Sequence, residues 1–351
     1  MFYFNFMEDK KMRYLIICLI SLLLLGCSQT EKELMFKKTE VTMFGDKDEN
    51  KPGTIGEIGF MAINKNQDVY IIDLGYKKIK KYSKNGIFIR DYGNGEGRGP
   101  GEFIYPFSID VDSENNIYVT DLTKREMVVI DSSNQVKIIL KTKYEPSNVV
   151  VTEPGIVYIS GMPASNTGKI IYKYDLNREK NYELPILKFC DRIDPNGNDI
   201  LKYNIARDGM IKDNNGNIYY SFPFPYEIRV YNENGEYLNK YIRNIKTFIP
   251  PYTKQENNRT VTAWENSIVD PMIINERLMC IRVFQNALEK EYYDFYNTKT
   301  HSYIGLINSN SLGIEQVSTI KSDSQGYIYY SQNEPYPHIV KMKLELLNDA
   351  E

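Results

Sequence analysis

The chain carries a repeated pattern of short hydrophobic runs separated by polar turns. Six of these runs are β-branched and aromatic, which is typical of buried strands, and they lie at 68–73, 116–121, 156–161, 217–222, 278–283 and 327–332. Turns rich in Asn, Asp and Gly precede most of them and favour tight connections between antiparallel strands. No segment shows a convincing amphipathic helix. The pattern therefore predicts an all-β protein.

Each run belongs to a larger unit of four predicted strands. One predicted strand precedes the run and two follow it, as in FMAIN, DVYIID, KIKKYS and GIFIRDYG of the first unit. The unit occurs six times, with spacings of 40 to 61 residues. Such a period indicates a β-propeller, because a four-stranded sheet can bury both faces when it packs radially against its neighbours.

The last unit shows only three predicted strands before the chain ends. The segment ELMFKKTEV at 33–41 precedes the first unit and has the composition of a further strand. We expect it to complete the last blade and so close the ring. The fold prediction is a six-bladed β-propeller of four-stranded antiparallel blades at 34–348, closed by this N-terminal strand.

The N-terminus has the pattern of a secretory signal. Basic residues at 10–13 precede the apolar run 14–25, which is followed by Gly26 and Cys27. The run has 12 residues, whereas a membrane-spanning helix needs about 20. We therefore interpret 1–27 as a signal peptide and 28–33 as a polar tether.

The sequence LLGC at the end of this signal resembles the bacterial lipobox. The resemblance implies that Cys27 carries lipid and becomes the first residue of the mature chain. No Asp follows Cys27, so the resemblance also implies the outer membrane. Which side of that membrane the protein faces stays open.

The segment GRGPGEFIYPFSIDVDSENNIYVTD at 97–121 resembles tandem NHL repeats, and in this form it looks like the six-bladed β-propeller lipoproteins common in Bacteroidetes. The first two units match well, the fourth and sixth match in part, and the third and fifth match by spacing only. The resemblance implies a propeller in the cell envelope. It implies no particular reaction, since propellers host many unrelated activities.

The segment DYGNGEGRGPGEF at 91–103 has glycine at five alternate positions. A dinucleotide cradle needs GxGxxG at the start of a helix, but here the spacing differs and a predicted hairpin follows. We interpret the segment as a structural loop between the first and second blades. Its expected shaping residues are Gly97, Gly99, Pro100 and Gly101, with Phe103 filling the space between the blades.

Propeller geometry places several predicted loops on one face. Connections between blades share a face with the loops between second and third strands, so the Gly-rich loop lies beside two long insertions at about 187–208 and 244–270. Long loops of this kind are usually functional or disordered. The candidate ligand-binding residues expected on this face are Arg98, Arg125, Phe224, Tyr226, Tyr252, Trp264 and Tyr336. The alternative for each aromatic residue is that it packs an insertion onto the propeller.

Composition and charge restrict the chemistry. A net charge of -3 predicts no nucleic-acid partner. The chain has two histidines, too few for a three-His zinc site, while calcium needs only oxygen ligands and stays open. Asp73 and Asp121 occupy equivalent strand ends, where loop capping is the favoured role. Cys190 and Cys280 could pair, but the apolar run around Cys280 favours a buried thiol.

Two functions fit this sequence. The first is a lipid-anchored module, without a cofactor, that binds a glycan or peptide ligand or a protein partner, such as an outer-membrane transporter in an uptake complex. The second is a calcium-dependent propeller enzyme, either a lactonase-like hydrolase or a glycan lyase. Aromatic residues at the rim would favour binding, and acidic residues converging on the central channel would favour the enzyme.

Overall fold

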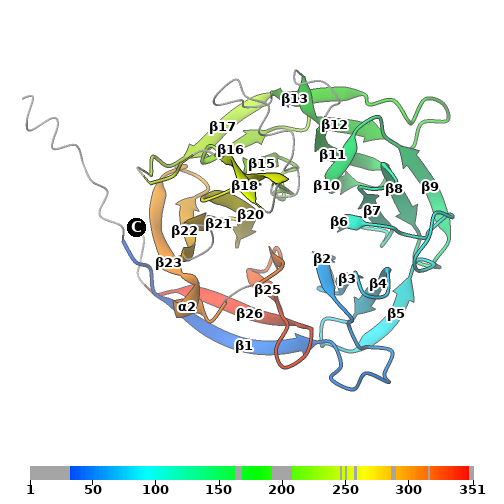
Figure 1. Cartoon of the computed structure of the whole chain (residues 1–351), viewed down its shortest axis with the longest axis horizontal. Coiled ribbons are helices and arrows are strands. Elements are labelled where there is room, and N and C mark those ends of the chain that lie inside the picture. The colour runs from blue at the N-terminus through cyan, green and yellow to red at the C-terminus, as the bar shows by residue number, and fades with distance from the viewer. Residues whose placement is uncertain are drawn as a thin grey trace, which may run out of the picture. The chain divides into compact units, whose positions relative to one another are not determined.

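Six four-stranded antiparallel sheets are arranged in a ring (Figure 1). The structure is a computed structural model and describes residues 32–162, 168–191, 208–245, 247–249, 251–256, 259–285, 290–314 and 317–347. In this part of the chain the helical content is one short turn, α2 (Ser309–Leu312). The prediction of an all-β, six-bladed propeller is confirmed. The predicted signal peptide and residues 28–31 of the tether lie outside the described residues.

Within each blade the strands follow one another from the centre of the ring to its edge. The strands of the first three blades are β2 (Ile58–Ile63), β3 (Val69–Asp73), β4 (Lys78–Tyr82) and β5 (Phe88–Tyr92); β6 (Pro106–Val111), β7 (Ile117–Asp121), β8 (Glu126–Ile130) and β9 (Val136–Lys141); and β10 (Glu145–Glu153), β11 (Ile156–Met162), β12 (Lys169–Asp175) and β13 (Leu187–Asp191). Those of the last three are β14 (Gly209–Lys212), β15 (Ile218–Phe222), β16 (Glu227–Tyr231) and β17 (Tyr237–Ile242); β20 (Ser267–Ile274), β21 (Leu278–Gln285), β22 (Lys290–Asn297) and β23 (Tyr303–Asn308); and β24 (Ile320–Ser322), β25 (Tyr327–Gln332) and β26 (His338–Leu346).

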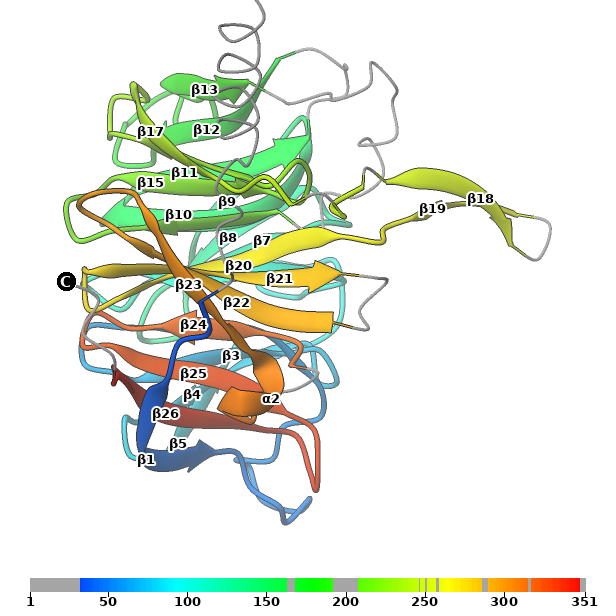
Figure 2. The same ribbon diagram turned by 90° about the vertical axis from the view of Figure 1, so that its left-hand side faces the viewer.

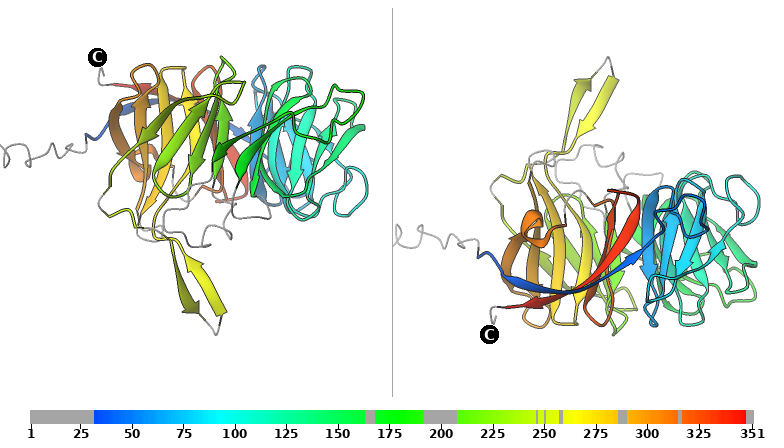
Figure 3. Two further views of the ribbon diagram at one scale, coloured as in Figure 1. Left: turned by 90° about the horizontal axis from the view of Figure 1, so that it is seen from above. Right: turned by 90° about the horizontal axis from the view of Figure 1, so that it is seen from below.

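The ring is closed by the N-terminal strand β1 (Phe36–Phe44), which completes the sixth blade. β1 pairs antiparallel with β26, from Phe36 opposite Leu346 to Phe44 opposite Ile339, and the two strands run side by side along the outside of the ring (Figure 3). The predicted closure is therefore confirmed. The sixth blade therefore joins β1 to the last three strands of the ring in one antiparallel ladder.

The core consists of six hydrophobic clusters, and each lies between two neighbouring blades. One position of the second strand recurs in these clusters and faces the following blade: Tyr70, Tyr118, Tyr158, Cys280, Tyr219 and Tyr329. Tyrosine suits this position because its ring fills the interface while its hydroxyl reaches a polar group at the edge. The hydroxyls of Tyr118 and Tyr329, for example, donate to Asp112 and Asp323, each at 2.9 Å.

The outer strand of the third blade begins later than the sequence pattern predicted. The insertion expected from about residue 187 implies a strand that ends there, but β13 spans Leu187–Asp191 and so occupies the start of that insertion. Pro185 has no N–H for a strand ladder, whereas Phe189 and Cys190 are buried in the blade interface. The rest of that insertion, 192–207, lies outside the described residues.

The second insertion contains regular structure that the sequence pattern did not predict. Within 244–270, β18 (Tyr252–Glu256) and β19 (Arg259–Ala263) form a separate two-stranded sheet, and the first strand of the fifth blade already begins at Ser267. We call this two-stranded sheet the ribbon. Among the described residues, no helix is long and apolar enough to cross a membrane.

Candidate functional site

The ribbon projects from one face of the ring, well beyond the ends of the blades (Figures 2 and 3). We call this face, which carries the loops 93–105, 223–226, 243–266 and 333–337, the insertion face. Every residue of β18 is exposed. The ribbon is therefore presented to solvent on a rigid scaffold, as binding segments often are.

Three of the candidate aromatic residues anchor the base of the ribbon. Trp264, which directly follows β19, is buried. The ring of Phe224 stacks on Phe248 at 5.7 Å with an interplanar angle of 7°. The hydroxyl of Tyr226 donates to Asp294 Oδ2 at 2.7 Å inside the interface of the fourth and fifth blades. These side chains pack the insertion onto the propeller and are not open to a ligand in this structure.

An ion pair fixes the chain where the insertion begins. Arg243, the residue after β17, donates from Nη1 to both carboxylate oxygens of Asp294, at 2.6 and 2.8 Å. The Arg243 side chain is 9 % exposed and that of Asp294 is fully buried. Tyr303 donates to the same carboxylate at 3.3 Å. The ribbon therefore leaves the ring from a fixed point.

The remaining candidates are accessible and lie at separate places on the insertion face. Tyr252 is 40 % exposed, and its hydroxyl donates to Glu265 Oε1 at 2.6 Å. Arg98 and Arg125 are exposed in the loops around the second blade, and Arg125 pairs with Glu145 at 3.1 Å. Tyr336 is half-buried, with its ring against His338 in the sixth blade. The candidates therefore surround the ring and do not form one pocket.

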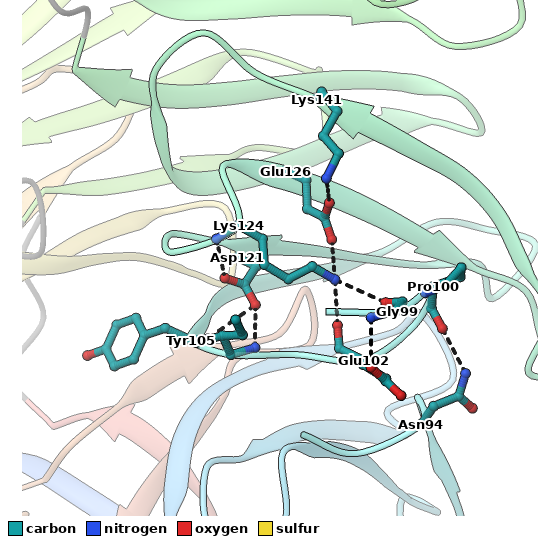
Figure 4. Close-up of polar contacts among 10 residues, drawn as sticks. Asn94, Gly99, Pro100, Glu102, Tyr105, Asp121, Lys124, Glu126 and Lys141 are labelled. Atoms are coloured by element: carbon teal, nitrogen blue, oxygen red, sulfur yellow. Dashed lines mark hydrogen bonds and ion pairs between the residues drawn. The ribbon is translucent and has the colours of Figure 1, made fainter. Parts of the chain in front are cut away.

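The Gly-rich loop surrounds a buried ammonium group (Figure 4). Lys124 Nζ donates to the main-chain oxygens of Gly99 at 3.1 Å and Glu102 at 2.9 Å. The Lys124 side chain is 4 % exposed and forms an ion pair with the buried Glu126. Asn94 Nδ2 also donates to the oxygen of Pro100 at 2.8 Å. A phosphate cradle would need converging N–H groups, whereas the loop presents carbonyl oxygens to a cation.

Close contacts explain the glycines of this loop. A Cβ on Gly97 would lie 2.0 Å from Glu102 Oε2, and one on Gly101 would lie 2.9 Å from Val136. Phe103 is fully buried in the cluster between the first and second blades. A Cβ on Gly93 would lie 2.7 Å from its ring. The glycines therefore let the loop fold closely over Phe103 and Glu102.

Asp73 and Asp121 act as loop caps. Asp73 accepts hydrogen bonds from the main-chain N–H groups of Gly56, Glu57, Gly75 and Tyr76. Asp121 accepts equivalent bonds from Ile104, Tyr105 and Lys124, at 2.8 to 3.1 Å. This arrangement occupies both carboxylates and confirms the interpretation of the two residues as caps. The two aspartates therefore have the same role in neighbouring blades, which is to hold the main chain of the adjoining loops.

Hydroxyl side chains form a second recurring feature, which the sequence analysis missed. Equivalent second-strand residues are buried in four blades: Thr120, Ser160, Ser221 and Ser331. The oxygens of Thr120 and Ser160 accept the N–H groups of Ser108 and Asn148, each at 3.0 Å. The inner strands are bulged at these places, and the hydroxyls satisfy the N–H groups that the bulges leave unpaired.

In the third and fourth blades this feature includes a carboxylate. Asp208 Oδ2 accepts from Ser147 at 3.1 Å, Ser160 at 3.0 Å and Tyr220 at 2.9 Å. Asp208 Oδ1 is buried and has no hydrogen-bond partner among the described residues. Burial raises the pKa of Asp208 to about 6, against the opposing effect of the hydroxyl donors. No sequence motif marked this residue, because it lies at the end of the first predicted insertion.

Metal and thiol chemistry find little support in the described residues. No group of three or more His, Cys, Asp and Glu side chains there is arranged to hold a metal ion. Cys190 and Cys280 are both buried free thiols, which confirms the interpretation that they are not paired.

The comparisons with known proteins support the fold and do not assign a function. No protein-family model and no curated protein match the sequence. Among solved structures, the chain is similar to a Bacteroides vulgatus member of the DUF4221 family, with 8 % identity, a TM-score of 0.59, and coverage of 91 % of this chain and 100 % of that chain. It is also similar to a Bacteroides fragilis protein described as exported, with 13 % identity and a TM-score of 0.58. That match covers 90 % of this chain and 96 % of that chain. A gluconolactonase from Xanthomonas campestris is similar with 10 % identity and a TM-score of 0.52, and that match covers 90 % of this chain and 98 % of that chain. At these identities the likeness shows the fold alone.

Proposed function

We propose that this protein is a lipid-anchored propeller of the cell envelope that binds a protein partner through its insertion face. The observation that carries the proposal is the ribbon. A two-stranded sheet is marginally stable in water, and this one is exposed along all of β18. A partner that pairs with the ribbon would supply the contacts that an isolated hairpin lacks.

The ribbon has the chemistry of a strand-pairing surface. β18 and β19 pair only with each other in the described part of the chain, so each has an outer edge open to a further strand. One face combines charged and apolar residues, with Lys254 opposite Val261 and Glu256 opposite Arg259. An extended segment of a partner could add to the edge by main-chain hydrogen bonds, while these side chains select it. A periplasmic or surface segment of an outer-membrane transporter is a partner of this class.

The envelope location rests on the signal pattern and on Cys27. Replacing Cys27 by Ser should abolish incorporation of a labelled fatty acid and release the chain from the membrane fraction. Retained labelling would contradict the proposed anchor. The binding proposal itself requires neither a cofactor nor nucleic acid.

A second candidate function is the calcium-dependent hydrolase or lyase, and one observation favours it. Asp208 keeps a buried oxygen without a partner in the part of the chain that the structure describes, and its pKa of about 6 would let it exchange a proton near neutral pH. A cation bound at this oxygen would provide the missing partner. The hydroxyls of Ser147 and Ser160 adjoin the same carboxylate.

Thermal unfolding of a soluble chain beginning at Ser28 separates the two functions. A ligand at a hundred times its Kd stabilises the folded state by about 2.7 kcal/mol. A rise in Tm with peptides or glycans, unaffected by chelator, would support binding. A rise with calcium that chelator reverses, and that Asp208→Asn removes, would support the enzyme and count against the binding proposal.

A further inference from the structure

A cavity lies at the outer rim of the ring between the third and fourth blades, whose outer strands are neighbours in Figure 1. Its volume is about 530 Å³, and its walls come from β12 and β13 on one side and from β16, β17 and the turn between them on the other. Cavities of roughly 300–1,000 Å³ are typical of small-molecule sites. Among the described residues, none of the insertion-face candidates lines it.

The fourth blade contributes one face of two paired strands to this cavity. Tyr231 of β16 points to the third blade, where its ring contacts that of Phe189 at 5.0 Å. Alternate residues of a strand share a face, so Arg229 points the same way. In the ladder with β17, Lys240 lies opposite Arg229 and Tyr237 lies opposite Tyr231. These side chains therefore form one continuous wall.

The charged groups of the lining are paired with one another. Lys169 Nζ donates to both carboxylate oxygens of Asp191 at 2.7 Å. Arg229 Nε donates to Glu227 Oε1 at 2.6 Å, and Lys240 Nζ lies 3.5 Å from Glu227 Oε2. A charged ligand would have to compete with one of these pairs. The cavity therefore suits a neutral ligand better than an anion or a cation.

Lys188 does not change this balance. It lies in β13 at the border of the cavity, but its ammonium group lies over the ring of Tyr172 at 5.8 Å. Tyr172 belongs to the hydrophobic cluster between the second and third blades. The charge of Lys188 is therefore directed to the other face of the blade.

The paired groups still offer hydrogen bonds to a ligand. Each carboxylate oxygen has two lone pairs and each ammonium group has three N–H donors, so one ion pair does not use them all. The side chains of Lys169 and Asp191 are 42 % and 72 % exposed. Arg229 Nη1 also donates to the main-chain oxygen of Asp191 at 2.9 Å, which ties the two walls together. The cavity therefore presents donors and acceptors side by side, as ligand hydroxyls require.

An aromatic surface adjoins these polar groups. Tyr237 is 54 % exposed, and its ring meets that of Tyr231 at 6.0 Å and 73°. The turn beside it packs tightly, since a Cβ on Gly235 would lie 2.9 Å from both Leu187 and Phe189. An exposed ring held beside polar groups can pack against the C–H face of a sugar while the polar groups bind its hydroxyls.

We propose that this cavity binds a neutral saccharide. The sugar ring lies against Tyr237. Its hydroxyls donate to Asp191 and Glu227 and accept from Lys169 and Lys240. A saccharide fits this dense polar wall better than a neutral peptide does, because a peptide main chain offers one donor and one acceptor per residue. The site is independent of the partner surface proposed for the ribbon.

Calorimetric titration of the soluble chain from Ser28 tests the proposal. The probes are the neutral trisaccharides maltotriose, cellotriose, xylotriose and mannotriose. We expect at least one to bind, with an affinity almost independent of salt, since no ion pair forms between ligand and protein. Trigalacturonate and triserine, which represent an anionic sugar and a neutral peptide, should bind at least tenfold more weakly.

Variants of the exposed ring locate the binding. Tyr237→Ala should lower the affinity at least tenfold, whereas Tyr237→Phe keeps the ring and should bind like the original chain. Tyr76 is the matched control, because it is 51 % exposed and lies in the loop between β3 and β4. Tyr76→Ala should leave the affinity unchanged. Asp191→Ala should lower it severalfold.

Several results would overturn the proposal. They are no binding of any neutral trisaccharide, tighter binding of trigalacturonate or of triserine, and an equal loss in Tyr237→Ala and Tyr76→Ala. The Tm of each variant without ligand reports its folding. A chain without the ribbon should bind the saccharide normally, so failure here is distinguishable from failure of the partner proposal.

Discussion

Lys124 Nζ lies 2.6 Å from Glu126 Oε1, and both side chains are almost completely buried under the Gly-rich loop. The remaining hydrogens of the ammonium group are directed to loop carbonyls. The segment of the sequence that most resembles a phosphate-binding motif is therefore held in place by a cation. Its role is to connect the first two blades.

This pair should make a large contribution to stability. Lys124→Met leaves Glu126 buried beside a single cation, Lys141, and leaves the loop carbonyls without their donor. We expect the free energy of unfolding to fall by about 3 kcal/mol, because removing one partner of a buried pair is costly. Urea denaturation measures this change.

Lys141→Met provides the matched control. Lys141 also contacts Glu126, but its side chain is 67 % exposed. Exposed pairs contribute about 0–1 kcal/mol. Equal losses in the two variants would contradict the buried role assigned to Lys124.

The close packing of the Gly-rich loop can be tested with two glycines of similar backbone conformation. Gly93 has φ of 82° and Gly216 has φ of 81°, so Ala carries a similar backbone penalty of about 1 kcal/mol at both. A Cβ at 93 also meets Phe103, whereas a Cβ at 216 meets nothing within 4 Å. Gly93→Ala should therefore cost about 1–3 kcal/mol more than Gly216→Ala.

The Phe103→Leu variant, which removes the aromatic ring, tests whether contact with that ring causes the extra cost of Gly93→Ala. In that background the extra cost of Gly93→Ala should shrink, because the clashing ring atom is gone. Strictly additive effects of the two substitutions would indicate another origin.

Stability should depend on pH through Asp208. Its pKa of about 6 in the folded chain exceeds the usual value of 3.8, so the folded state binds the proton more tightly than the unfolded state. The contribution of Asp208 to stability is therefore highest below about pH 4, falls as pH rises to about 6, and is constant above. From the difference between these two pKa values, we expect a fall of roughly 3 kcal/mol.

Asp208→Asn removes this titration. The difference in unfolding free energy between the variant and the original chain should shift in favour of the variant between pH 4 and pH 6.5. Denaturation at several pH values measures it. A difference that stays constant across this range would show that the carboxyl does not titrate there.

Both thiols should be unreactive in the folded protein. Burial raises the pKa of Cys190 to about 12 and also raises that of Cys280, and the thiolate is the reactive form. A soluble chain from Ser28 should show no fast reaction with a disulfide reagent at pH 8 and two reactive thiols in denaturant. A count of zero in denaturant would reveal a disulfide.

Much of the fold could be predicted because the four-strand unit repeats. Alternating hydrophobic positions and Asn- or Asp-containing turns are local signals, and closure by β1 follows from counting strands. The abundance of tyrosine also has a local reason, since one position of the second strand faces the next blade. The late start of β13 could not be predicted, because burial of Phe189 against the fourth blade is a tertiary effect.

The site was less predictable for the same reason. Phe224, Tyr226 and Trp264 have the composition of a binding surface, but they are buried because the insertion folds back onto the blades. The ribbon has few apolar residues to mark it as strand. Asp208 became notable only when its position brought Ser147, Ser160 and Tyr220 together.

Site-directed photo-crosslinking in the native envelope tests the central claim most directly. A photoreactive benzoylphenylalanine would replace Lys254 on β18, which is 47 % exposed, or, as the control, Lys84 at an exposed turn on the opposite face. We predict a discrete protein adduct from position 254 and none from position 84. Adducts from both positions, or from neither, would contradict the proposal that the ribbon binds a partner.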